Sequence, residues 1–446
     1  MRDLTRGSIS KQLVSFAAPM LIGNLFQQLY SIVDALVVGR YVGGGALAAV
    51  GVSMGVIGFL TSMLIGLVTG SSIVISQFYG AKQHDRLKST VSVSIIFLAG
   101  LSVLISVLGV VFAPQVLQLL NADPEILDDA LTYMRIIMGG MVFSIFYNMQ
   151  VAYLRALGDT RIPLFILIFT VCLSGALTFY CVIVLEMGVF GAAISTVFAQ
   201  MIAMLLCYLY TRRRVPLLLV EKLAFDFGLF KTILRYGIPA SLQFSFVTFA
   251  HLLITRLINS FGYPAMAAIT AVGRIDSLAI MPIATISMAL STFVAQNMGA
   301  DLEDRAKKGM RVAIIYMLAF AVCISIILMS FAPQLISLFL NQGDANSTEI
   351  LDIGRNYMSI MVIFYFLFAI LFGFNGFFRG VGDAVIAMVF PIISLSCRTA
   401  SAYILVLYVG MGPEALAWSI PIGWGVSGII AFIYYKKRLW VGKLAS

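Results

Sequence analysis

The chain has 446 residues, of which 61% are hydrophobic and only 11% are charged, and its formal net charge is +9. Soluble domains are about half apolar and a quarter charged, so this composition excludes a soluble protein and indicates a multi-span membrane protein. The five cysteines all lie in apolar runs, which argues against a disulfide framework in the loops and offers no zinc-ligand spacing.

Twelve apolar runs are long enough to cross a bilayer as helices. They cover approximately residues 13–38, 46–78, 90–112, 131–154, 162–185, 189–210, 233–260, 265–297, 309–331, 354–378, 385–409 and 414–435. The first residues, MRDLTRGSIS, lead into the first run without a small-residue cleavage site, so we expect them to be retained. The fold class predicted is an all-α integral membrane protein with twelve transmembrane helices.

The basic residues gather in the connections on one side of these runs. They include the arginine run at 212–214, the cluster around Lys307 and the tail residues 436–438, whereas the opposite loops, such as NADPEILDD and NQGDANSTE, are acidic or neutral. Positive-inside bias therefore predicts that both termini and the 211–232 connection are cytoplasmic. Because topology accounts for the basic excess, no nucleic-acid partner is expected.

The sequence is two copies of one unit. With an offset of about 219, QFYGAKQHDR meets QNMGADLEDR, and with an offset of about 224, YLRALGD meets FFRGVGD. Six runs in each copy predict two parallel six-helix lobes. We expect lobes at 1–210 and 233–446, joined by a cytoplasmic linker at 211–232.

The repeat contains a paired R-x-x-G-D motif, at 155–159 and 379–383. It could form a site, but Gly often closes one helix while Asp caps the next. We favour this capping interpretation, with each arginine acting as a cytoplasmic anchor.

Asp34 lies deep in the first run, where a carboxylate costs on the order of 2.5–3.5 kcal/mol on insertion scales. Helical spacing places Tyr30 and Gln27 on the same face. Such acids usually face a bundle interior or a water-filled cavity and are often functional. A structural pairing of Asp34 with a nearby arginine remains the alternative.

The second half carries a different set of deep polar residues. Candidates for substrate binding, together with Gln27 and Tyr30, are Gln243, Phe244, His251, Asp276 and Arg398. The alternative is structural, since Asp276 could neutralise Arg274 or Arg398 and a lone membrane histidine is often hydrogen-bonded packing. No Ser/His/Asp set, H-E-x-x-H or Cys/His cluster appears, so neither an enzyme nor a metal site is expected.

The stretches GNLFQQLYSIVDALVVGRYVG, QFYGAKQHDR, YLRALGDTRIP, MGVFGAAIST and IDSLAIMP resemble the multidrug and toxic compound extrusion (MATE) family, in particular its bacterial members. The resemblance covers essentially the whole chain. It implies an exporter in the cytoplasmic membrane that exchanges inward-moving protons or sodium for organic, often cationic and aromatic, drugs.

The resemblance also implies a cation-coupling site in the first lobe. The family's first-helix acid falls on Asp34, and its Asn, Asp and Thr positions in spans five and six fall on Ser174, Thr178 and Thr196. Only the threonine in span six matches. Sodium prefers several oxygen ligands, so these residues would form a weak sodium site at most, whereas a proton needs only Asp34. We therefore favour proton coupling, with no other cofactor.

Other functions are less well supported. A lipid-linked precursor flippase would have more spans or a strongly cationic cavity, and a major-facilitator carrier would have a basic signature between spans two and three. A non-transporting receptor or scaffold would need a sizeable soluble domain. The partners we expect are a small organic substrate and membrane lipid, and we expect the chain to be monomeric.

Overall fold

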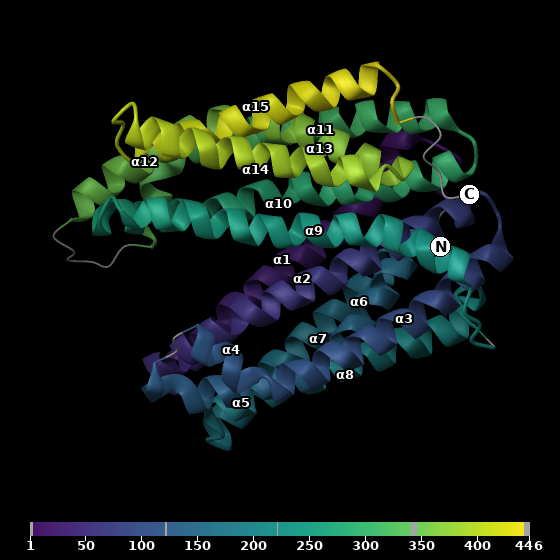
Figure 1. Cartoon of the computed structure of the whole chain (residues 1–446), viewed down its shortest axis with the longest axis horizontal. Helices are drawn as coiled ribbons and strands as arrows, with labels where there is room; N and C mark the ends of the chain where they lie inside the picture. The colour runs from purple at the N-terminus through teal and green to yellow at the C-terminus, as the bar shows by residue number, and fades with distance from the viewer. Residues whose placement is uncertain (1–2, 121–122, 221, 340–345, 441–446) are drawn as a thin grey trace. The chain divides into compact units, whose positions relative to one another are not determined.

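The computed structural model describes residues 3–120, 123–220, 222–339 and 346–440, without the side chains of residues 32–36, 38, 248 and 252. These ranges are helical and contain no strand (Figure 1). The helices of the first half are α1 (Ile9–Tyr41), α2 (Gly44–Gly80), α3 (His84–Val111), α4 (Ala113–Leu119), α5 (Leu127–Gly139), α6 (Met141–Ala156), α7 (Arg161–Phe179) and α8 (Gly188–Arg214). Those that follow are α9 (Phe227–Asn259), α10 (Tyr263–Gly299), α11 (Glu303–Ser337), α12 (Ser347–Ile363), α13 (Tyr365–Val381), α14 (Ala384–Leu407) and α15 (Glu414–Lys436).

The helix lengths account for twelve membrane spans. Within the described ranges, nine helices are long and apolar enough to cross a bilayer, and two bent helix pairs bring the number to eleven. The twelfth is α1, whose 33 residues would extend about 50 Å at 1.5 Å per residue. Its apolar run is interrupted by Asn24, Gln27, Gln28 and Asp34.

The fourth and tenth spans are each built from two helices. α5 meets α6 at an angle of 46°, and α12 meets α13 at 48°. The breaks fall at Gly140 and Phe364, which occupy the same place in the two copies of the repeat. Hydropathy alone does not show such a bend, because both pieces of each span are apolar.

Contacts divide the chain into two compact units. One contains Ala18–Ser241, and the other contains Leu4–Ala17 together with the chain from Leu242 onwards. α1 and α9 therefore each contribute to both units. The lobe and linker boundaries expected from the repeat stay a prediction.

The N-terminal segment is held in the second unit by hydrogen bonds to α10 and α11. The backbone N–H of Leu4 donates to Gln296 Oε1 at 3.1 Å, and Asn297 Nδ2 donates to the Leu4 carbonyl at 3.2 Å. Arg305 Nη2 donates to Gln12 Oε1 at 2.9 Å. These bonds satisfy backbone and amide groups at the start of the chain.

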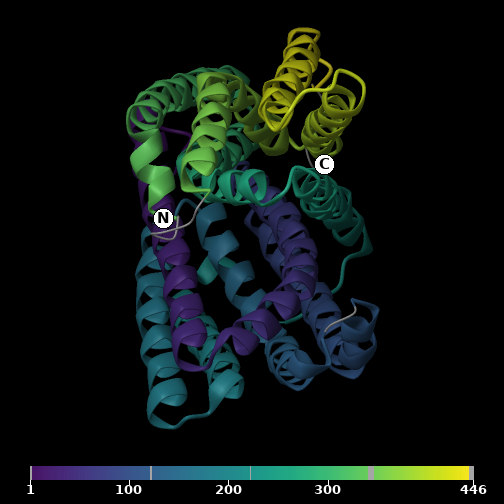
Figure 2. The same cartoon turned by 90° about the vertical axis from the view of Figure 1, so that its left-hand side faces the viewer.

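The second unit is packed around α10, which contacts α11, α12 and α13, while α14 and α15 lie side by side (Figures 1 and 2). Close approach of α13 to α10 depends on two glycines one turn apart. A Cβ on Gly376 would lie 2.5 Å from the Ser287 carbonyl oxygen, and one on Gly380 would lie 2.5 Å from that of Ser291. Small residues at such spacing let two membrane helices meet backbone to backbone.

We predict that Gly376→Ala destabilises the protein, because the new methyl group would force α13 away from α10. Overpacking of this kind costs about 1–3 kcal/mol. The matched control is Gly273→Ala on α10, where an added Cβ meets nothing within 4 Å. Thermal unfolding in detergent should show a lower midpoint for Gly376→Ala than for Gly273→Ala. Equal midpoints would contradict the packing argument.

Candidate functional site

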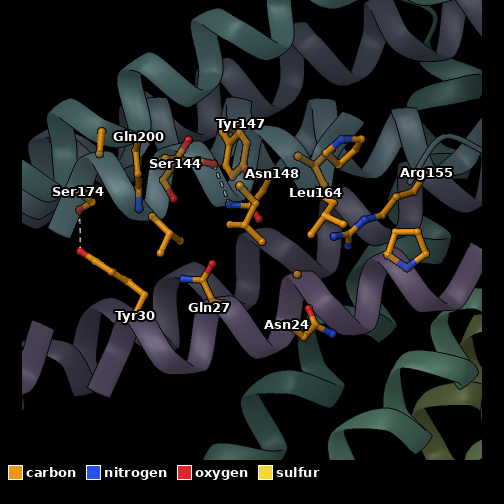
Figure 3. Close-up of a pocket in the computed structure, with 18 of the residues that line it drawn as sticks. Asn24, Gln27, Tyr30, Ser144, Tyr147, Asn148, Arg155, Leu164, Ser174 and Gln200 are labelled. Atoms are coloured by element: carbon orange, nitrogen blue, oxygen red, sulfur yellow. Dashed lines mark hydrogen bonds between the residues drawn. The ribbon is translucent and has the colours of Figure 1, made fainter. Parts of the chain in front are cut away.

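A cavity of about 410 Å³ lies within the first unit (Figure 3). Its walls come from α1, α2, α6, α7 and α8, and they mix amides, hydroxyls and apolar groups with one guanidinium. The polar residues that line it are Asn24, Gln27, Tyr30, Ser144, Tyr147, Asn148, Arg155, Thr160, Thr170, Ser174, Thr196 and Gln200. A volume of this order suits a small organic molecule.

Three hydroxyls meet at one end of this cavity. The Tyr30 hydroxyl lies 2.7 Å from Ser174 Oγ and 3.5 Å from Thr196 Oγ1, and so joins α1 to α7 and α8. Thr196 also donates to the carbonyl of Ala192, one turn earlier in its own helix, at 3.1 Å. The cluster orients the Tyr30 ring along the cavity wall (Figure 3).

The structure thus brings together several residues singled out from the sequence. Gln27, Tyr30, Ser174 and Thr196 line the same cavity, whereas Thr178 is buried, with 1% of its surface exposed, one turn beyond Ser174. The Asp34 side chain lies outside the described residues, and only its position in α1, one turn after Tyr30, is given. The cation-coupling role of this set stays a prediction.

Sequence reasoning missed Arg155 as a cavity residue. The expectation that it anchors the helix at the cytoplasmic surface is wrong, because its guanidinium lines the cavity and its Nε is buried with no hydrogen-bond partner in the described chain. The repeated R-x-x-G-D motif was the sequence feature that pointed to Arg155, but we interpreted the motif as a helix cap.

The capping interpretation holds for one of the two aspartates. Asp159 Oδ1 accepts hydrogen bonds from the backbone N–H groups of Arg161 and Ile162, at 3.2 and 3.3 Å, and so caps α7. Asp383 precedes α14 but accepts no such bond with its side chain. Both carboxylates also accept a hydrogen bond from a tyrosine hydroxyl, Asp159 from Tyr210 at 3.0 Å and Asp383 from Tyr434 at 2.6 Å.

In the second unit, Asp276 is held by a tyrosine. The Tyr365 hydroxyl donates to Asp276 Oδ1 at 2.7 Å. Among the described residues, no Lys or Arg nitrogen lies within 4.0 Å of this carboxylate, so the direct ion pair with Arg274 or Arg398, one of the two alternatives left open by the sequence, is not formed. The Arg274 guanidinium instead lies over the Phe339 ring, 6.0 Å from its centroid. The Nε of Arg398 is buried with no hydrogen-bond partner in the described chain.

The remaining candidates of the second half do not join Asp276 in a hydrogen-bonded group. Gln243 Oε1 accepts from Arg379 Nη2 at 3.4 Å, which places it in a different network. Phe244 is half-buried and His251 is exposed. The substrate-binding role of these residues stays a prediction.

The described residues contain no group of three or more His, Cys, Asp or Glu side chains that could hold a metal ion. The cavity instead presents neutral oxygens and amides, with one cation. Such a lining can bind an organic molecule through hydrogen bonds and apolar contact.

Comparison with known proteins identifies the family. The MatE family model matches residues 19–181 and 239–404, one segment in each half of the repeat. The chain belongs to the MatE family. The expected resemblance to multidrug and toxic compound extrusion transporters is confirmed, and with it the membrane location.

The relatives of this MatE protein span its whole length. The probable multidrug resistance protein YoeA of Bacillus subtilis is 28% identical over 97% of this chain and 94% of its own. The probable multidrug resistance protein NorM of Thermotoga maritima is 28% identical over 97% of this chain and 91% of its own. The outward-facing structure of a multidrug resistance MATE transporter of the MOP superfamily superposes with a TM-score of 0.91 at 24% identity, covering 98% and 97% of the two chains. The all-α fold of twelve helices in two lobes is thereby confirmed.

We predict that Tyr30→Phe and Ser174→Ala each slow transport by this MatE protein, and that the double variant is little worse than either. Each single change breaks the same hydrogen bond, and contacting residues couple by about 0.5–3 kcal/mol. The control is Thr69→Val on α2, because the Thr69 hydroxyl bonds the carbonyl of Ile65 in its own helix, at 2.8 Å, and Thr69 does not line the cavity. Rates of fluorescent-cation efflux from membrane vesicles measure the effect, and strictly additive losses would contradict a shared role.

Proposed function

We propose that this protein is a cation-coupled antiporter that exports drugs or other organic, often cationic, compounds across the cytoplasmic membrane. The observation that carries the proposal is the polar cavity inside the first unit, lined by the face of α1 that contains Gln27 and Tyr30. Asp34 follows one turn later on this helix. An ionisable group beside a substrate cavity gives a means of coupling ion movement to substrate binding.

Proton coupling fits the lining better than sodium coupling. The described cavity residues include no carboxylate, and the family's Asn and Asp positions in span five are occupied by Ser174 and Thr178. Hard cations such as sodium need several oxygen ligands, and a carboxylate supplies the charge that holds them, whereas a proton needs a single carboxylate. We assign that carboxylate to Asp34.

The transport cycle then depends on two protonation states of the Asp34 carboxyl group. A proton entering from outside neutralises Asp34, the first lobe rearranges, and the compound is released outwards. Loss of the proton towards the cytoplasm restores the charge and the affinity for the compound. Coupling requires the two occupants to favour different states, since a ligand with equal affinity for both shifts no equilibrium. One chain is sufficient for this cycle, so we expect a monomer.

We predict that Asp34→Asn abolishes gradient-driven export while the protein still folds, because the amide imitates the neutral carboxyl permanently. The measurement is accumulation of a fluorescent organic cation in proteoliposomes under an imposed pH gradient or an imposed sodium gradient. Asp128→Asn, in the acidic first turn of α5, serves as the control. Wild-type transport should follow the pH gradient. Uphill accumulation by Asp34→Asn at the wild-type rate would show that Asp34 is structural.

The positive-inside distribution supports an orientation with both termini and the arginines at 212–214 in the cytoplasm. We predict that a cysteine at position 347 reacts with an impermeant maleimide applied to whole cells, whereas one at position 307 reacts only after permeabilisation. The five native cysteines are first replaced, since two of them, Cys172 and Cys323, are exposed. The opposite labelling pattern would reverse both the topology and the direction of transport.

A further inference from the structure

The arginines of the two R-x-x-G-D motifs differ in their hydrogen bonding. In the second unit, Arg379 Nη2 donates to Asn375 Oδ1, one turn earlier on α13, at 2.8 Å, and to Gln243 Oε1 at 3.4 Å. The Asn375 amide nitrogen donates to the Ala387 carbonyl at 2.5 Å, which turns its oxygen towards the arginine. The protein thus supplies its own acceptors for the guanidinium of Arg379.

The first unit lacks this arrangement at the matching place. The residue one turn before Arg155 on α6 is Val151, which stands where the second copy has Asn375. A valine side chain offers no acceptor, and Arg155 Nε is buried without a hydrogen-bond partner in the described chain. A buried N–H donor without an acceptor is costly, and a ligand in the cavity that Arg155 lines could provide the missing acceptor.

The side chain of Arg155 faces the cavity rather than the protein interior. Figure 3 shows Arg155 and Asn24 at one end of the cavity and Tyr30 and Ser174 at the other. Arg155 is the one formally charged group among the described lining residues.

We propose that Arg155 is the docking point for an anionic group, a carboxylate or sulfonate, carried by the organic compounds that enter the first-lobe cavity. A guanidinium presents a rigid fork of donors that matches such a group with two parallel hydrogen bonds. Amides from Asn24 and Asn148 line the same cavity and provide further donors. The cavity of about 410 Å³ has the volume of a small organic molecule, which favours an organic anion over a free inorganic one.

The substrate class thus extends to anionic and zwitterionic compounds. The claim that anionic compounds are transported rests on the proposed export function. Binding at Arg155 is a separate property that needs no ion gradient, so the two ideas can fail independently.

The test compares two dyes that share a xanthene ring, anionic fluorescein and cationic rhodamine 123. Their binding to the detergent-purified full-length protein is followed by fluorescence anisotropy at constant salt. Arg155→Gln removes the charge. Val151→Asn keeps the charge but supplies the acceptor that Asn375 gives to Arg379. Val151→Leu is the control for side-chain size, because leucine and asparagine have nearly the same shape.

Arg155→Gln should weaken fluorescein binding about tenfold or more, the loss expected for a charge-assisted hydrogen bond, while rhodamine 123 binding stays equal or tightens. Val151→Asn should also weaken fluorescein binding, and by more than Val151→Leu does. Unfolding midpoints identify any variant that fails to fold. If Arg155→Gln does not fold, Val151→Asn still tests the proposal.

Two results would overturn the proposal. One is equal fluorescein affinity in Val151→Asn and Val151→Leu together with no selective loss in Arg155→Gln. The other is displacement of fluorescein from the wild-type protein by low millimolar inorganic phosphate, which would identify a site for small free anions. If Asp34→Asn loses export but still binds fluorescein, the anion site is supported independently of the export mechanism. If the wild-type protein exports compounds but does not bind fluorescein, the anion site is refuted and the proposed export function is not.

Discussion

The whole structure depends on one constraint, which is that a bilayer offers no hydrogen bonds to a polar group. Backbone groups are satisfied by continuous helices, and hydroxyls in the spans commonly bond a carbonyl one turn earlier, as Thr170 bonds Ile166 and Thr285 bonds Met281. Deeper polar groups are turned inwards and paired, as in the contact of Tyr365 with Asp276. The first-unit cavity is where this constraint is relaxed, because its amides, hydroxyls and arginine line open space that a ligand can fill.

Duplication produced a common frame and two different interiors. Both copies bend their fourth span at the same place, and both tie an aspartate at the start of the fifth span to a tyrosine near the end of the sixth. These contacts hold helix ends together. Interior positions have diverged, since Ser174 of the first copy corresponds to Arg398 of the second, and Val151 corresponds to Asn375. Because the helix arrangement tolerates such changes, the interior of the first copy can bind substrate and couple it to ion movement, while the interior of the second copy carries different charges.

The sequence predicted the spans and the repeat because apolar length and self-similarity are local properties of the chain. Helical spacing on α1 and the family pattern on α7 and α8 also singled out Gln27, Tyr30, Ser174 and Thr196, which line one cavity, while their roles stay a prediction. The sequence could not predict that Tyr365 is the partner of Asp276, since the two are far apart in the chain and hydropathy does not pair helices. Arg155 was misassigned for a similar reason. The repeat aligns Val151 with Asn375, but only the structure shows that Asn375 is the acceptor for Arg379 and that Arg155 lines the cavity.

The attachment of the N-terminal segment imposes an order on biosynthesis. Leu4 precedes its hydrogen-bond partners, Gln296 and Asn297, by some 292 residues, so it leaves the ribosome well before they are made. At about 5–20 residues per second, that delay is roughly 15–60 s. During this interval the first six spans must be inserted and must pack while the start of α1 still lacks its final contacts. The first half is therefore complete before Leu4 gains its hydrogen bonds, and the segment around Leu4 is fixed only as the second half emerges.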